Sequence, residues 1–232
     1  GSHSFFGPLL GLEVGVEPVP WKDGVAIARW DVESSLREYL AHYLVFKVAA
    51  DKVLSSTAMQ ALVAAAPGVA EMALLGKLTA PMRHRWYTRE ADVVVVDGYA
   101  TGQFMAMLRA PVGLAGTAAE GALHRHAQTT ARLLADPALC EYRIVTLAEE
   151  MTVTEACEMA QALQAELGIA PRLLCNRLIE LPETLPTLPP ADPAAPFVEH
   201  MQRVAQRQRE SLAALEALGA ARRGPVIGLP LV

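Results

Sequence analysis

The sequence has no apolar run long enough to cross a membrane, no long run of basic residues and few cysteines. A transmembrane helix needs about 20 predominantly apolar residues, so no transmembrane segment is expected. A general nucleic-acid surface needs a basic patch or stripe. The densest basic cluster is residues 83–85, with Arg89 nearby, and the formal net charge is -5. We therefore expect no nucleic-acid partner.

The three cysteines, Cys140, Cys157 and Cys175, are widely spaced, and no Cys-x-x-Cys pair occurs. This spacing indicates neither a disulfide framework nor a zinc site. Reduced thiols are typical of cytoplasmic proteins, and a cytoplasmic location is what we predict.

A phosphate-binding loop is also missing. The pattern G-x-x-x-x-G-K-[ST], which surrounds phosphates with backbone N–H groups and a lysine, does not occur in the 232 residues. Gly76 and Lys77 are followed by Leu78, and we interpret Lys77 as a solvated lysine at a helix end. Since phosphoryl transfer depends on such a cradle, the chain alone is predicted to be inactive towards ATP, with no catalytic residue in isolation.

The sequence does contain short strand patterns separated by helical ones. They are Val93–Val96, a run of four valines, then Ile144–Thr146 and Leu173–Cys175. Continuous apolar strands suit a parallel sheet that is covered on both faces. The sequence therefore predicts an α/β fold, in which these segments are neighbouring parallel strands of a sheet flanked by helices. Residues 225–232 read as a last strand.

The domain organisation follows from the same pattern. We predict one α/β domain over residues 5–232, with a helical subregion at about 33–90. Six prolines between 181 and 196 predict a loop rather than a helix or strand. A long amphipathic helix is predicted over residues 197–218, and residues 1–3 look like the remnant of a tag.

Helix boundaries can also be predicted from particular residues. Gln103 is expected to begin a helix that Pro111 ends. Thr152 and Glu155 form the Thr-x-x-Glu pattern of a capping box, which predicts a helix start. Gly168 is expected to end that helix.

Asp97 follows the valine run directly, and the glycine-containing loop 98–102 follows it. Ligands of open parallel sheets bind beyond the carboxyl ends of the strands. An aspartate there can hold Mg²⁺ through water, and a glycine-rich loop can offer backbone N–H groups to a phosphate. The alternative is that Asp97 caps the helix after it, and the residues alone leave both interpretations open.

Several segments in the same order resemble the ArsA-type ATPases, a family that includes anion-transporting ATPases and the targeting factor for tail-anchored membrane proteins. Residues 93–111, VVVVDGYATGQFMAMLRAP, resemble its switch II segment. Residues 144–177 resemble the next strand–helix–strand block, and the C-terminal PVIGLPLV is similar to the last strand. Residues 31–40 and 66–77 resemble the helical segment between, so the resemblance covers nearly the whole chain.

The resemblance implies a deviant P-loop NTPase-like fold and a set of switch II residues. It implies that Asp97 is the magnesium-associated aspartate, bound through water only if a nucleotide binds. The matching switch residues are Gly98, Thr101, Gly102 and Gln103, and Gln103 stands where the family usually has histidine.

The resemblance also implies an adenine-binding group formed by Asn176, Arg177, Leu229 and Pro230. Of these, Asn176 matches the asparagine whose side chain contacts adenine. ATP and magnesium are the cofactors that the family implies, and neither is expected to bind tightly to this chain alone.

Three functions remain open at this point. Phe5–Glu17 looks like the stretch just after switch I, so the phosphate loop would precede it and is either natively lost or missing from this sequence. The first expectation is a non-hydrolysing regulatory or binding subunit, a homodimer or a heterodimer with a P-loop-bearing relative. The second is a fragment of an active ATPase. The third is a module that binds hydrophobic clients through the Lys52–Leu78 helices, whose apolar residues are otherwise core packing.

Overall fold

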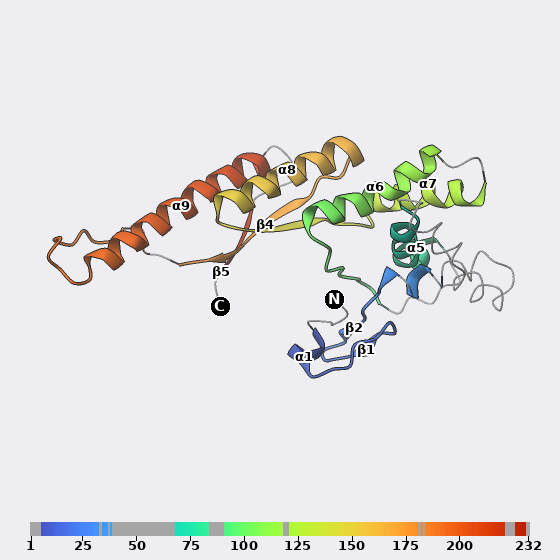
Figure 1. Ribbon diagram of the computed structural model, residues 1–232, viewed down its shortest axis with the longest axis horizontal. Helices are drawn as coiled ribbons and strands as arrows, with labels where there is room; N and C mark the ends of the chain where they lie inside the picture. The colour runs from blue at the N-terminus through green and yellow to red at the C-terminus, as the bar shows by residue number, and fades with distance from the viewer. Residues whose placement is uncertain are drawn as a thin grey trace, which may run out of the picture. The chain divides into compact units, whose positions relative to one another are not determined.

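A computed structural model describes residues 6–32, 34–36, 38, 68–83, 91–117, 121–180, 182, 184–220 and 226–230 (Figure 1). The chain divides into two compact units, an N-terminal unit, Gly1–Leu134, and a C-terminal unit, Ala135–Val232. The prediction of one domain over residues 5–232 stays a prediction.

The N-terminal unit begins with a short helix and a small hairpin. Helix α1 covers Phe6–Leu10, and strands β1, Val19–Pro20, and β2, Ala26–Ile27, pair antiparallel. The turn between the strands uses left-handed backbone at Asp23 (φ 54°) and Gly24 (φ 74°), which aspartate and glycine adopt more readily than most residues.

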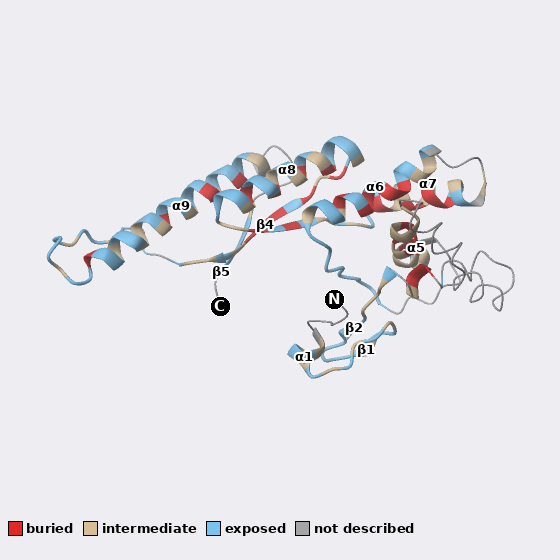
Figure 2. Cartoon of the chain, viewed as in Figure 1, coloured by how far each residue is buried: buried red, intermediate tan, exposed pale blue. Residues whose placement is uncertain are grey.

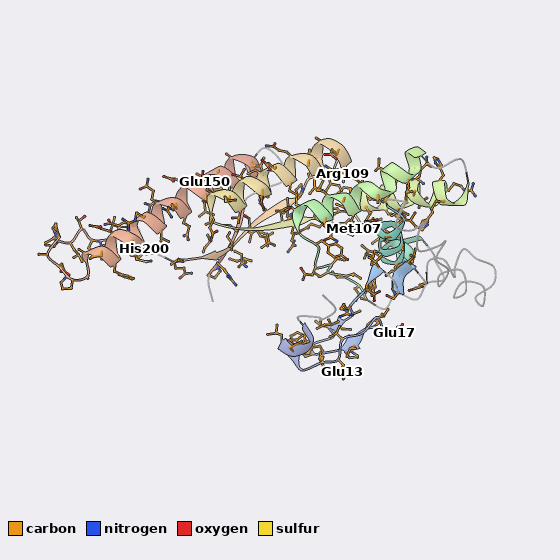
Figure 3. All side chains as sticks on the ribbon, viewed as in Figure 1. Glu13, Glu17, Met107, Arg109, Glu150 and His200 are labelled. Carbon is orange, nitrogen blue, oxygen red and sulfur yellow. The ribbon has the colours of Figure 1, made fainter. Side chains whose placement is uncertain are left out.

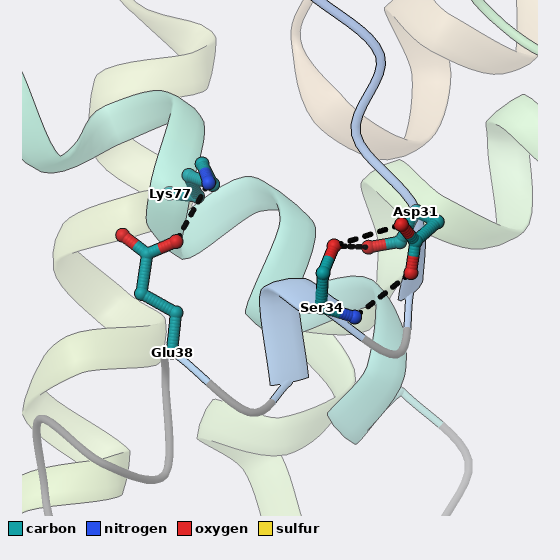
Figure 4. A network of polar contacts seen from close by, with 4 residues as sticks. All are labelled: Asp31, Ser34, Glu38 and Lys77. Atoms are coloured by element: carbon teal, nitrogen blue, oxygen red, sulfur yellow. Dashed lines mark hydrogen bonds and ion pairs between the residues drawn. The ribbon is translucent and has the colours of Figure 1, made fainter. Parts of the chain in front are cut away.

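Asp31 caps the helical residues that follow the hairpin (Figure 4). Its Oδ1 accepts a 2.8 Å hydrogen bond from the Ser34 amide, and its Oδ2 accepts one of 2.9 Å from the Ser34 hydroxyl. In the same region, Lys77 Nζ lies 2.6 Å from Glu38 Oε2. The Lys77 side chain is only 14% exposed, so our interpretation of Lys77 as a solvated lysine is wrong.

The other helices of this unit are α5, Val69–Arg83, α6, Thr101–Thr117, and α7, Ala122–Ala135. Helix α5 packs against α6, and Met72 and Leu75 are buried (Figure 2). Pro111 does not end α6 but lies inside it and is buried. A proline in a helix costs a hydrogen bond, and the packing around Pro111 offsets this cost.

The valine run does not form the predicted strand. Residues 93–100 have no regular secondary structure, and Val93 and Val95 are 77% and 90% exposed. A strand exists only where another strand completes its hydrogen bonds, and within the described chain none pairs with this segment. The prediction that Val93–Val96 neighbours the other parallel strands is therefore wrong for this structure.

The C-terminal unit is an α/β sheet structure, as predicted. Its elements in chain order are β3 Arg143–Leu147, α8 Glu150–Leu167, β4 Arg172–Leu178, α9 Ala195–Ala220 and β5 Ile227–Pro230. The strands form a three-stranded sheet of order β3-β4-β5, and both pairings are parallel. The parallel pairing of Ile144–Thr146 with Leu173–Cys175 and the C-terminal strand are confirmed.

Helices α8 and α9 pack on each other and lie on the same side of this sheet (Figure 1). Leu163 of α8, Cys175 of β4 and Leu215 of α9 are at most 1% exposed. On β3, the buried Ile144 and Thr146 flank Val145, which is 60% exposed. This alternation is that of a sheet with one covered face. The continuous apolar strand patterns of the sequence instead predicted a sheet that is covered on both faces.

Helix α8 begins earlier than the capping-box pattern predicts. Its first residue is Glu150, and Glu149 is the N-cap residue without a side-chain hydrogen bond. Thr152 lies inside the helix, where its hydroxyl donates to the carbonyls of Leu147 and Glu149. Gly168 ends the helix in left-handed conformation (φ 69°), as predicted. No helix in the described ranges is both long and apolar enough to cross a membrane.

Candidate functional site

The sheet brings the predicted adenine group together at one edge. Parallel register places Leu147 beside Asn176 and Leu178 beside Pro230. Arg177 and Leu229 lie between these positions in their strands. The four residues Asn176, Arg177, Leu229 and Pro230 therefore sit at the carboxyl ends of β4 and β5, and we call this region the carboxyl edge. Ligands of parallel sheets bind at such edges.

The backbone at this edge is locally irregular. Arg177 has a positive φ of 57°, a conformation that is uncommon outside glycine, asparagine and aspartate. The β4–β5 register shifts between Cys175 and Leu178, which is a bulge that re-aims the residues around it. Backbone strain of this kind clusters at ligand sites, and here it coincides with the predicted adenine group.

Asn176 serves this turn through one atom of its side chain. Its Oδ1 accepts a 2.9 Å hydrogen bond from the Arg177 amide. The side-chain NH₂ group carries two more donors, and no described residue accepts from it. Asn176 is half-buried, whereas Arg177 is exposed. The Asn176 side chain thus keeps two N–H donors that no described residue uses.

Two glutamines of α9 hold the chain after β4, and sequence reasoning missed both. Gln208 makes two hydrogen bonds of 3.0 Å to Ile179: its Oε1 accepts from the Ile179 N–H, and its Nε2 donates to the Ile179 carbonyl. Gln202 Nε2 donates to the Pro186 carbonyl at 3.0 Å. The start of the proline-rich loop is therefore fastened to the helix. Neither contact leaves a periodic pattern in the sequence.

The switch-like group lies in the N-terminal unit. Asp97 is exposed and makes no hydrogen bond or ion pair to a described residue, so the helix-capping alternative for Asp97 is not observed. Thr101, Gly102 and Gln103 form the first turn of α6 instead of a loop. At Gly98 an added Cβ would stand 2.9 Å from the Phe104 ring, so a larger residue there would require that ring to shift.

Metal-ligating side chains and thiols give weaker evidence for a functional site. Within the described ranges no three His, Cys, Asp or Glu residues are grouped as a metal site. The cysteines are free thiols, and burial raises the pKa of Cys140 and of Cys175, which disfavours the reactive thiolate.

The proposed client groove falls mostly on residues 52–67, which lie outside the described residues. Its remaining part is α5, where Met72 and Leu75 are buried in the N-terminal unit. For this part of the segment, core packing is the interpretation that the structure supports.

No protein-family model matches this chain, and no curated protein matches it.

Proposed function

We propose that this chain is a nucleotide-binding-type α/β subunit that recognises an adenine base at the carboxyl edge and does not hydrolyse ATP by itself. The observation that carries the proposal is the Asn176 side chain, whose oxygen is occupied by the Arg177 amide while its NH₂ group is left as a donor. Adenine ring nitrogens are acceptors, as are the ring acceptors of other bases. The preference for adenine comes from the resemblance to the ArsA-type ATPases.

We also propose how the subunit assembles and which cofactors it uses. Because the 232 residues contain no G-x-x-x-x-G-K-[ST] loop, we propose a regulatory or binding role, either in a homodimer or beside a P-loop-bearing relative. Magnesium would associate with Asp97 through water, and only with a nucleotide present. The bulge at Arg177 and the two hydrogen bonds between Gln208 and Ile179 support the base site. The switch II role of Asp97 and the formation of a dimer are proposed from the resemblance alone.

Binding of adenine compounds should depend on the Asn176 amide. We expect wild-type protein to bind adenosine weakly, at about millimolar dissociation constant, in equilibrium dialysis. Asn176→Ala should weaken binding about tenfold, since one net hydrogen bond contributes about that much.

Asn176→Asp is the discriminating variant. It keeps an oxygen for the Arg177 amide but removes both N–H donors, so it should lose binding like alanine. If Asn176→Asp binds adenosine as wild type does, Asn176 serves only the turn and the base-reading proposal is wrong.

Purified protein should show no magnesium-dependent ATP turnover above background. Catalysis of phosphoryl transfer is mostly positioning and charge stabilisation by a phosphate cradle, which this sequence lacks. Asp97→Ala should leave the background phosphate release unchanged. Release that wild-type protein catalyses and Asp97→Ala abolishes would instead support an active ATPase.

A further inference from the structure

The backbone around Asn176 departs from regular sheet pairing. The described β3–β4 ladder ends at Asn176, which pairs with Leu147. On the other side of β4, the register with β5 shifts between Cys175 and Leu178. Arg177 takes its positive φ of 57° within this irregular stretch. The conformation of Asn176 and Arg177 therefore depends on how the chain is held after Arg177.

The Asn176 side chain and the Arg177 backbone are linked by a hydrogen bond. The Arg177 N–H donates to Asn176 Oδ1 at 2.9 Å. A left-handed residue other than glycine persists only where the surrounding structure fixes it. Because the chain is anchored in the sheet on both sides, a change in φ at Arg177 must rotate the neighbouring peptide groups. One of these carries the N–H that holds the Asn176 amide.

Gln208 holds the backbone that follows Arg177. Its side chain makes both 3.0 Å hydrogen bonds to Ile179, and Ile179 is two residues after Arg177, within about 7 Å along the chain. The β5 partner of Leu178 is Pro230, which has no N–H to donate. The β4–β5 ladder thus lacks one donor at this position, and Gln208 supplies the next pair of hydrogen bonds.

Helix α9 holds Gln208 in place. Gln208 lies about two turns after His200, which Figure 3 labels on the same helix. Ala205 and Ser211 are three residues to either side of Gln208, and both are buried. Residues at this spacing lie on one side of a helix, so Gln208 extends from the packed side of α9.

Resting on the proposed function, we infer that Gln208 is a positioning residue for the base site. It holds Ile179, which keeps Arg177 in its left-handed conformation, and Arg177 in turn orients the Asn176 amide. A side chain that is already oriented does not lose its freedom when a ligand binds, so affinity is gained. Gln208 itself makes no contact with the base.

Nuclear magnetic resonance of the full chain tests the positioning step without any ligand. Asn176 is the only asparagine of the sequence, so protein labelled with ¹⁵N-asparagine shows a single side-chain NH₂ group. Gln208→Met should move this NH₂ signal away from its wild-type position. The matched control, Gln206→Met, changes a glutamine that donates to Glu210 on the exposed side of α9, and it should leave the signal in place.

Equilibrium dialysis with adenosine tests the effect on binding. Gln208→Met should weaken adenosine binding about threefold to tenfold, which is the range expected for immobilising one side chain. Gln206→Met should bind as wild type does. Should Gln208→Met not fold by circular dichroism, Gln208→Glu takes its place. That variant keeps an oxygen for the Ile179 N–H but loses the donor to the Ile179 carbonyl, and it should shift both readouts in the same direction.

The outcomes separate this inference from the proposed function. If the Asn176 signal stays in place in the Gln208 variant, or if the signal moves while adenosine affinity is unchanged, the positioning inference is wrong and the base site stands. If wild-type protein binds no adenosine, the proposed function fails and the inference about binding fails with it. The NH₂ signal then still shows whether Gln208 orients Asn176.

Discussion

Replacing Leu215 with alanine is expected to lower the free energy of unfolding of the C-terminal unit by about 2–5 kcal/mol. Leu215 is 0% exposed and belongs to α9, which packs on β4 and α8. Truncation removes buried methyl groups and leaves a cavity that the surrounding side chains only partly fill. In a unit of this size, that change is a large fraction of ordinary domain stability.

Hydrogen exchange followed by mass spectrometry is the suitable measurement. All three tryptophans, Trp21, Trp30 and Trp86, lie in the N-terminal unit, so tryptophan fluorescence would report the other unit. The control is Phe197→Ala in the same helix, a larger truncation at a side chain that is 66% exposed. It should cost about 0.5 kcal/mol or less, and equal effects of the two variants would contradict the packing described for α9.

Gln208→Met should destabilise the connection after β4 by about 1–3 kcal/mol. Methionine has a similar length but cannot form the two 3.0 Å hydrogen bonds to Ile179. The half-buried N–H and carbonyl of Ile179 would then lack their partner, which is costlier than losing an exposed contact. We expect faster amide exchange from Arg177 into the proline-rich loop.

Gln206→Met is the matched control for this experiment. Gln206 donates to Glu210 at 2.8 Å on the exposed side of the same helix. Such a pair one turn apart contributes only about 0.2–0.5 kcal/mol. If Gln206→Met and Gln208→Met accelerate amide exchange after β4 equally, the hydrogen bonds between Gln208 and Ile179 do not hold this segment.

Much of the C-terminal unit could be predicted from the sequence because its strands and helices carry strong local signals. Ile144–Thr146 and Leu173–Cys175 form parallel strands, and Gly168 ends α8 with positive φ. Short apolar strands joined by an amphipathic helix have few alternative arrangements. A glycine after a helical pattern has one dominant use, as a left-handed cap.

The predictions that the structure contradicts also failed for physical reasons. Valine favours strands only when a neighbouring strand and a covering face are present, and Val93–Val96 has neither within the described structure. Pro111 stays inside α6 because tertiary packing outweighs one lost hydrogen bond. Thr152 resembles a capping residue, but α8 begins at Glu150 and uses the threonine hydroxyl internally.

The candidate site was only partly visible in the sequence. Asn176 could be singled out because it stands at the end of a strand pattern, at the position where the resemblance to the ArsA-type ATPases implies an adenine-contacting asparagine. Gln208 could not be singled out, since it is 29 residues from Ile179 and contacts backbone atoms, which every residue has. The left-handed Arg177 was equally hidden, because arginine does not favour that conformation.

The exposed valine run also bears on how copies of this protein behave towards one another. A short segment of high β-propensity without proline is a template for cross-β stacking, and here it is bounded by Asp92 and Asp97. Charged residues in such flanking positions act as gatekeepers, since stacking identical segments would align their carboxylates. Counterions that screen those carboxylates weaken this protection, so we expect self-association through the valine run to increase with ionic strength.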